Sequence, residues 1–152
     1  MVNFFSVLEI PVGYKIDQKT LLKNYLKKQS LVHPDIEESR SNESVYLNIA
    51  YNTLLNPVNR AMHLLEIHKR NVDAIAPEFI SEAFNLREKY DSLQSSEDKN
   101  KFQNKLSERI SELTSMLYDL EGDLDEFQKY FSLLKFISSF LQKVRSDVYS
   151  GN

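Results

Sequence analysis

The sequence contains no cysteine, and only three glycines and four prolines among its 152 residues. Without cysteine the chain has no disulfides, no thiolate zinc sites, no cysteine-held iron–sulfur clusters and no cysteine nucleophiles. The scarcity of glycine and proline favours helices joined by short turns. Together with a hydrophobic content of 41%, this composition predicts an all-α protein with an ordinary core.

Two further features are missing from the sequence. No hydrophobic run reaches the roughly 18 to 20 residues that a membrane-spanning helix needs, and the N-terminus lacks a basic region followed by an apolar stretch. We therefore expect a cytoplasmic protein without a membrane partner. The formal net charge of −3 argues against nucleic acid as a partner, because nucleic-acid-binding proteins carry a basic excess.

In the first 70 residues, the sequence predicts two antiparallel helices joined by a loop, with a small helix on each side. Asp17 is a good N-cap for the first long helix, which we expect to run to about Val32. The polar run EESRSN at 37–42 predicts the loop, and the second long helix is expected from about Asn42 to the residue before Pro57. Its buried residues should be Tyr46, Ile49, Ala50, Thr53 and Leu54.

The remainder of the chain predicts a second helical domain. We expect a first domain at 1–70, a linker at 71–76 and a three-helix bundle at 77–152. The first helix of this bundle should cover 78–93, and SSED at 95–98 supplies a cap for the next helix. In that helix and the last one, apolar residues recur at alternating spacings of four and three, which is typical of a bundle seam.

The motif His33-Pro34-Asp35 follows the first long helix. Histidine and aspartate do acid–base work, and Ser30 is close. However, three groups so near in sequence cannot easily adopt the geometry of a catalytic triad, in which a nucleophile, a base and a residue that orients the base lie in line. No glycine-rich turn that could form an oxyanion hole accompanies them. A metal site would lack a third ligand. We therefore expect neither an enzyme nor a metal centre, and helix termination by the proline is the simplest structural interpretation.

Several residues around this motif resemble the J domain of DnaJ-type co-chaperones. Tyr25 lies eight residues before His33. A stripe of lysines is formed by Lys19, Lys23 and Lys27, and the segment LNIAYNTLLNPVNRA follows the motif. The stretches NFFSVLEIPVGYKID and AYNTLLNPVNRAMHLLEIH narrow the resemblance to the HscB family, the J-type co-chaperones of iron–sulfur cluster assembly. FISEAFNLREKYDSL then resembles the scaffold-binding helix of that family. The resemblance implies an L-shaped molecule with a J domain stacked on a three-helix bundle.

The resemblance also implies one partner for the N-terminal domain and no cofactor. This partner is an HscA-like chaperone of the DnaK type, whose ATP hydrolysis His33, Pro34 and Asp35 would trigger. Lys23 and Lys27 would face an acidic patch on the chaperone, and the carboxylate of Asp35 could bind an arginine.

A second partner, an IscU-type scaffold protein for iron–sulfur clusters, is implied for the bundle. Ile80, Phe84 and Glu88 follow one another at a spacing of four on one helix, and Phe136 corresponds to a further apolar position of the family's binding patch. Apolar residues at helical spacing usually belong to a core, so a purely structural role stays open. The family often has acidic or larger apolar residues at three nearby positions, which here hold Asn85, Ser92 and Ser81.

Two other functions stay open at the level of the sequence. One is a general J protein whose bundle binds unfolded or membrane-associated clients. The other is a non-catalytic helical adaptor in which the HPD motif is incidental. An adaptor would leave the ATPase rate of a chaperone unchanged, whereas a general J protein would stimulate several DnaK-type chaperones without needing a scaffold protein.

Overall fold

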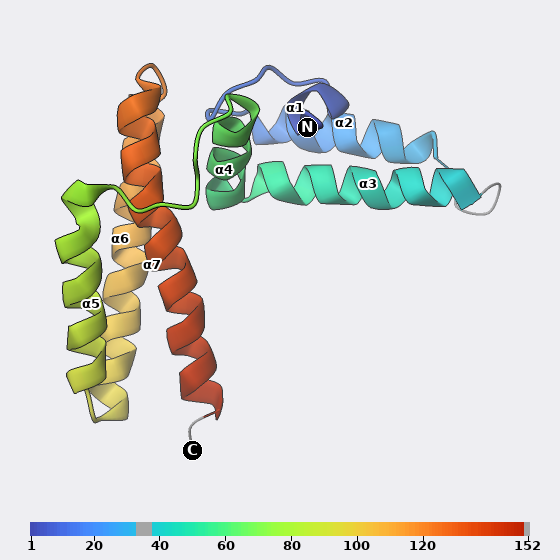
Figure 1. Ribbon diagram of the computed structural model, residues 1–152. Helices are drawn as coiled ribbons and strands as arrows, with labels where there is room; N and C mark the ends of the chain where they lie inside the picture. Colours follow the sequence, from blue (N-terminus) through green and yellow to red (C-terminus); the bar gives the residue numbers. More distant parts are fainter. Residues whose placement is uncertain (33–37, 151–152) are drawn as a thin grey trace. The chain divides into compact units, whose positions relative to one another are not determined.

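The computed structural model describes residues 1–32 and 38–150, and within these ranges every regular element is a helix (Figure 1). The all-α class predicted from the composition is therefore confirmed. The chain divides into two compact units, Met1–Arg70 and Asn71–Asn152, and the L-shaped arrangement stays a prediction. No helix in the described ranges is both long and apolar enough to cross a bilayer.

The first unit is built on a pair of antiparallel helices that lie side by side (Figure 1). Asp17 caps α2 as predicted, since its carboxylate accepts hydrogen bonds from the backbone N–H groups of Lys19 and Thr20. Tyr25 of α2 stacks on Tyr51 of α3 with 4.3 Å between ring centroids. The helices of this unit are α1 (Phe4–Val7), α2 (Gln18–Ser30), α3 (Glu38–Leu55) and α4 (Pro57–Ile67).

Helix α3 corrects two details of the prediction. It begins at Glu38 rather than near Asn42, so most of the polar run expected to form a loop is helical. Glutamate and arginine are good helix formers, and a polar segment can be helical wherever it needs no apolar partner. The buried face of α3 also differs from the predicted one, because Leu47 is buried, whereas Ile49 is 50% exposed.

The core of the first unit includes one charged side chain. Arg60 is 1% exposed, and its guanidinium donates a hydrogen bond of 2.8 Å to the backbone carbonyl of Leu54 and lies 4.9 Å from the ring centroid of Tyr14. The carbonyl and the aromatic face both offset the desolvation of the charge. The apolar core around it consists of Phe5, Leu8, Ile10, Tyr14, Leu21, Leu47, Ala50, Leu54, Ala61, Leu64 and Leu65.

His63 joins α4 to α1 from inside this core. It is 5% exposed, its Nε2 accepts a hydrogen bond of 3.0 Å from the backbone N–H of Phe4, and its ring stacks on that of Phe4 at 4.6 Å. An Nε2 atom that accepts a hydrogen bond carries no proton, so the imidazole is neutral. Burial lowers the pKa of His63 below its ordinary value.

Because His63 is buried in its neutral form, we expect the folded state to lose stability in mild acid. Because its pKa is lower in the folded than in the unfolded chain, the unfolded state binds more protons below about pH 6.5. The free energy of unfolding should be at its full value above that pH and fall as the pH decreases below it. Thermal unfolding followed by circular dichroism between pH 7.5 and 5 should show this loss, and it should be smaller in His63→Gln; an equal slope in both proteins would contradict the assignment.

The second unit is a three-helix bundle, and its main seam is the one that the sequence predicts. Helices α6 and α7 lie side by side (Figure 1), and both contribute buried apolar residues to the bundle. Its elements are η1 (Pro77–Phe79), α5 (Ile80–Ser92), α6 (Ser96–Leu120) and α7 (Leu124–Ser150). The buried residues of the seam are Phe102, Leu106, Leu113, Leu117, Phe127, Phe131, Leu133, Leu134, Ile137, Leu141 and Val144.

The segment 71–76, which we expected to be a linker, is hydrogen-bonded to α7. Lys135 donates a bond of 2.7 Å to the backbone carbonyl of Val72, and the backbone N–H of Ala76 donates one of 2.9 Å to the hydroxyl of Ser132. These bonds satisfy polar backbone groups of a segment that has no regular structure of its own. They fix the chain's approach to η1 and therefore the start of α5.

Candidate functional site

The expected chaperone-binding motif lies outside the described residues. His33, Pro34 and Asp35 follow α2 and precede α3 in the chain. Their role therefore stays a prediction that rests on the sequence.

The cationic face of α2 is described and exposed to solvent. Lys23 and Lys27 are both exposed, and neither forms an ion pair within the part of the chain that the structure describes. Lys28, on the inner side of α2, instead lies 3.7 Å from the carboxylate of Glu9. Helix α2 itself contains no acidic residue. Its outer face thus offers unneutralised positive charge to a partner.

Two leucines on this face were missed by the sequence analysis. Leu22 is 43% exposed and Leu26 is 55% exposed. Their spacing of four places them on one side of the helix, next to Lys23 and Lys27. The signal was present in the sequence, because Leu21 and Leu22 are consecutive and only one of them can point into the core. The face therefore combines positive charge with apolar surface.

Helix α5 presents its expected binding residues to solvent. Ile80 is 53% exposed, Phe84 is 59% exposed and Glu88 is also exposed. The side of α5 that faces the bundle holds Ala83, which is 8% exposed, and Tyr90, whose ring lies 5.6 Å from that of Phe102. The structure thus decides a point that the sequence left open, because Ile80 and Phe84 lie on the surface and not in the core.

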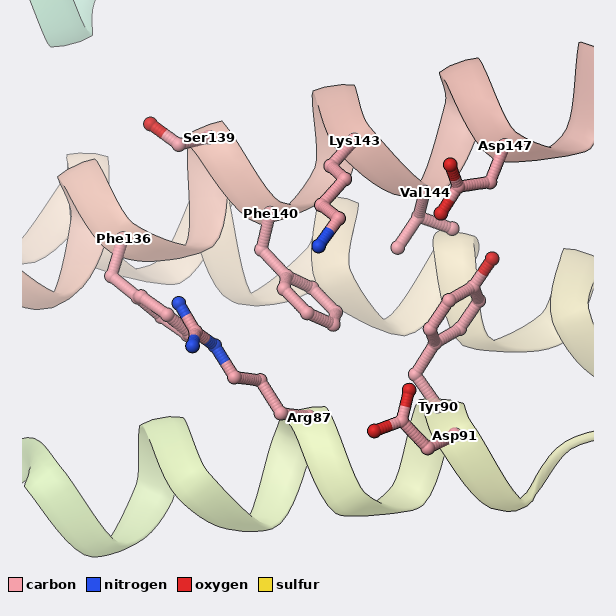
Figure 2. Close-up of a pocket in the computed structure, with 9 residues that line it drawn as sticks. All are labelled: Arg87, Tyr90, Asp91, Phe136, Ser139, Phe140, Lys143, Val144 and Asp147. Atoms are coloured by element: carbon pink, nitrogen blue, oxygen red, sulfur yellow. The ribbon is translucent and has the colours of Figure 1, made fainter. Parts of the chain in front are cut away.

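Phe136 lies on α7 at the edge of a cleft between α5 and α7. It is half-buried and stacks on Phe140 with 5.7 Å between ring centroids. The guanidinium of Arg87 lies 5.0 Å from the centroid of the Phe136 ring, as Figure 2 shows. Arg87 comes one helical turn after Phe84, so this contact places Phe136 opposite the C-terminal half of the helix that carries Ile80 and Phe84.

In residues 1–32 and 38–150 no group of three or more histidine, aspartate or glutamate side chains is arranged to hold a metal ion. The buried His63 stacks on the rings of Phe4 and Phe5, and its Nε2 accepts a hydrogen bond from the backbone N–H of Phe4.

Comparison with known proteins finds co-chaperones among the proteins that the chain resembles. No family model matches the sequence. The co-chaperone protein HscB of Buchnera aphidicola is 31% identical over 113 residues, which are 66% of this chain and 65% of that protein. The relatives that the chain resembles over this part of its length are co-chaperones named HscB. The human iron-sulfur cluster co-chaperone protein HscB is 29% identical over 106 residues, which are 61% of this chain and 45% of the human protein.

A solved structure supports the fold of this chain. The crystal structure of the human co-chaperone protein HscB superimposes with a TM-score of 0.82 at 21% identity, covering 97% of this chain and 82% of that one. The expected fold class, a J domain followed by a helical bundle, is confirmed. The curated relatives are longer than their matched parts, since the chain spans just under two thirds of the Buchnera protein, at 65%.

Proposed function

We propose that this chain is a co-chaperone that stimulates the ATPase of an HscA-like, DnaK-type chaperone in the cytoplasm. It would deliver an IscU-type scaffold protein to that chaperone during iron–sulfur cluster biogenesis. The observation that carries the proposal is the exposure of Ile80 and Phe84, at 53% and 59%. A large aromatic and a large aliphatic residue side by side on an otherwise well-packed bundle are typical of a surface that binds another protein.

The first unit supplies the surface for the chaperone. Lys23 and Lys27, exposed and without acidic neighbours on α2, suit a partner with an acidic patch, and such charges act mainly on the rate of association. Leu22 and Leu26 add apolar contacts beside them, which salt does not screen. Asp35 would then form the charge-assisted bond that the resemblance implies.

The steady-state ATPase rate of an HscA-like chaperone, with and without an IscU-type scaffold protein, tests the proposed function. We expect the chain to raise this rate, and the scaffold protein to raise it further when both are present. No change in the rate would favour the helical adaptor and overturn the proposal. Equal stimulation of several DnaK-type chaperones, with no binding of the scaffold protein, would favour a general J protein.

Removing both exposed lysines should slow docking to the chaperone. We expect the double variant Lys23→Ala, Lys27→Ala to associate more slowly, by about tenfold at low salt, and to respond less to added salt. Stopped-flow association at several salt concentrations measures both effects. The matched control is Lys101→Ala, Lys105→Ala, an exposed pair with the same spacing on α6, which should behave like the wild type. An unchanged salt dependence in the α2 variant would contradict the prediction.

A further inference from the structure

The cleft between α5 and α7 contains more than the expected scaffold-binding residue Phe136. It has a volume of about 360 Å³, and its aromatic wall is formed by Tyr90, Phe136 and Phe140 (Figure 2). Two cationic side chains also line it, Arg87 from α5 and Lys143 from α7. A cleft with an aromatic wall and a few charged groups is a typical binding site.

The two cations are available to an anionic group. Within the described residues neither Arg87 nor Lys143 forms an ion pair, and Figure 2 shows the amino group of Lys143 pointing into the cleft. The contact with Phe136, at 5.0 Å, orients the guanidinium of Arg87. A guanidinium stacked on a ring keeps its N–H groups at its edge, where they can bind a carboxylate through two hydrogen bonds.

The acidic residues of the cleft lie around Tyr90 (Figure 2). Burial, and then the negative charges of Asp147 and Asp91, raise the pKa of the Tyr90 hydroxyl. The negative charge is thus concentrated near this tyrosine, whereas Arg87 lies against Phe136. The end of the cleft that carries Phe136 therefore holds Arg87, and Lys143 lies between this end and the two aspartates (Figure 2).

We propose that this cleft receives an acidic side chain of the scaffold protein, whose carboxylate Arg87 and Lys143 bind. The proposal rests on the proposed function and extends its binding surface from Ile80 and Phe84 along α5. Continuity supports it, because Phe136 belongs both to the expected scaffold patch and to the wall of the cleft. An apolar anchor beside a charge-assisted contact gives both affinity and specificity. Arg87 and Lys143 thus select a scaffold protein with a carboxylate next to its apolar contact.

Calorimetric titration of an IscU-type scaffold protein into the 152-residue chain tests this inference. We expect Arg87→Met and Lys143→Met each to weaken binding about fivefold, and the double variant to weaken it more. Methionine keeps most of the apolar stem and removes the charge. Salt should weaken the binding of the double variant less than that of the wild type. Lys89→Met, an exposed lysine on the same helix outside the cleft, is the matched control and should bind like the wild type.

The outcomes separate this inference from the proposed function. If the wild-type chain does not bind the scaffold protein, the proposed function itself fails. If binding depends on Phe84 but is unchanged in Arg87→Met and Lys143→Met, only the role of the cleft is overturned. Equal losses in Lys89→Met and the cleft variants would show a general effect of net charge and would also overturn it. If Arg87→Met lowers the melting temperature through its contact with Phe136, Lys143→Met decides the question.

Discussion

Phe84→Ala is expected to weaken binding of the scaffold protein about thirtyfold and to leave the melting temperature of the chain unchanged. The ring is 59% exposed on α5, so truncation leaves no cavity inside the bundle. An aromatic residue at the centre of an interface commonly contributes on the order of 2 kcal/mol to binding, which corresponds to this factor. The double variant with Ile80→Ala should bind still more weakly, whereas Glu88→Ala should have a smaller effect.

Phe131→Ala is the matched control for this prediction. Phe131 is 1% exposed on α7, and truncating a buried phenylalanine destabilises a protein by about 3 to 5 kcal/mol. Its melting temperature should therefore fall by many degrees, in contrast to that of Phe84→Ala. Thermal unfolding and calorimetric titration on the same preparations distinguish the two residues. A large loss of stability in Phe84→Ala with affinity retained would remove Phe84 from the binding surface.

His33→Gln is expected to abolish stimulation of the chaperone ATPase while scaffold binding and the melting temperature stay unchanged. The resemblance to J domains assigns the trigger to the HPD motif, and glutamine keeps a polar side chain without the imidazole ring. Among the residues of the first unit whose burial the structure describes, the buried ones lie in α1, α2, α3, α4 and the segment between α1 and α2. We expect the folded state to tolerate the substitution, because the sequence predicts that this motif acts in binding rather than in core packing. Steady-state ATPase assays with the scaffold protein present measure the effect.

The same substitution at a second histidine is its control. His68 is exposed at the C-terminal end of α4, where its Nδ1 lies 2.8 Å from the backbone carbonyl of Leu64. His68→Gln removes an imidazole outside the HPD motif and should keep full stimulation. If a folded His33→Gln variant also stimulates fully, the HPD motif has no part in the mechanism.

The secondary structure could be predicted because local signals act over a few residues. The carboxylate of Asp17 satisfies the first N–H groups of α2, and Ser95 does the same for α6. The alternating apolar spacing from Phe102 to Leu117 marks a continuous stripe, which has to be buried along its length. These features need no knowledge of what lies opposite each helix. The predicted start of α3 was wrong, because polar residues such as those at 38–42 suit a helix as well as a loop.

The surface roles could be predicted only in part. The HPD motif and the lysine stripe were found from the sequence, and the role of the motif stays a prediction. The spacing of Ile80 and Phe84 showed that they share a face, but not whether another helix covers it. Leu47 and Ile49 pose the same problem on α3, where only the packing partners decide which residue is buried.

By itself, the sequence determined the all-α class, the helix caps, the seam of the bundle and the resemblance to the HscB family, because each depends on residues close together in the chain. The tertiary structure alone decided that Ile80 and Phe84 are exposed, that the segment 71–76 is bonded to α7, and that Arg87 and Lys143 line one cleft. Helical periodicity specifies which side chains share a face. Whether that face meets a partner, solvent or a charge from a distant helix depends on how the helices pack.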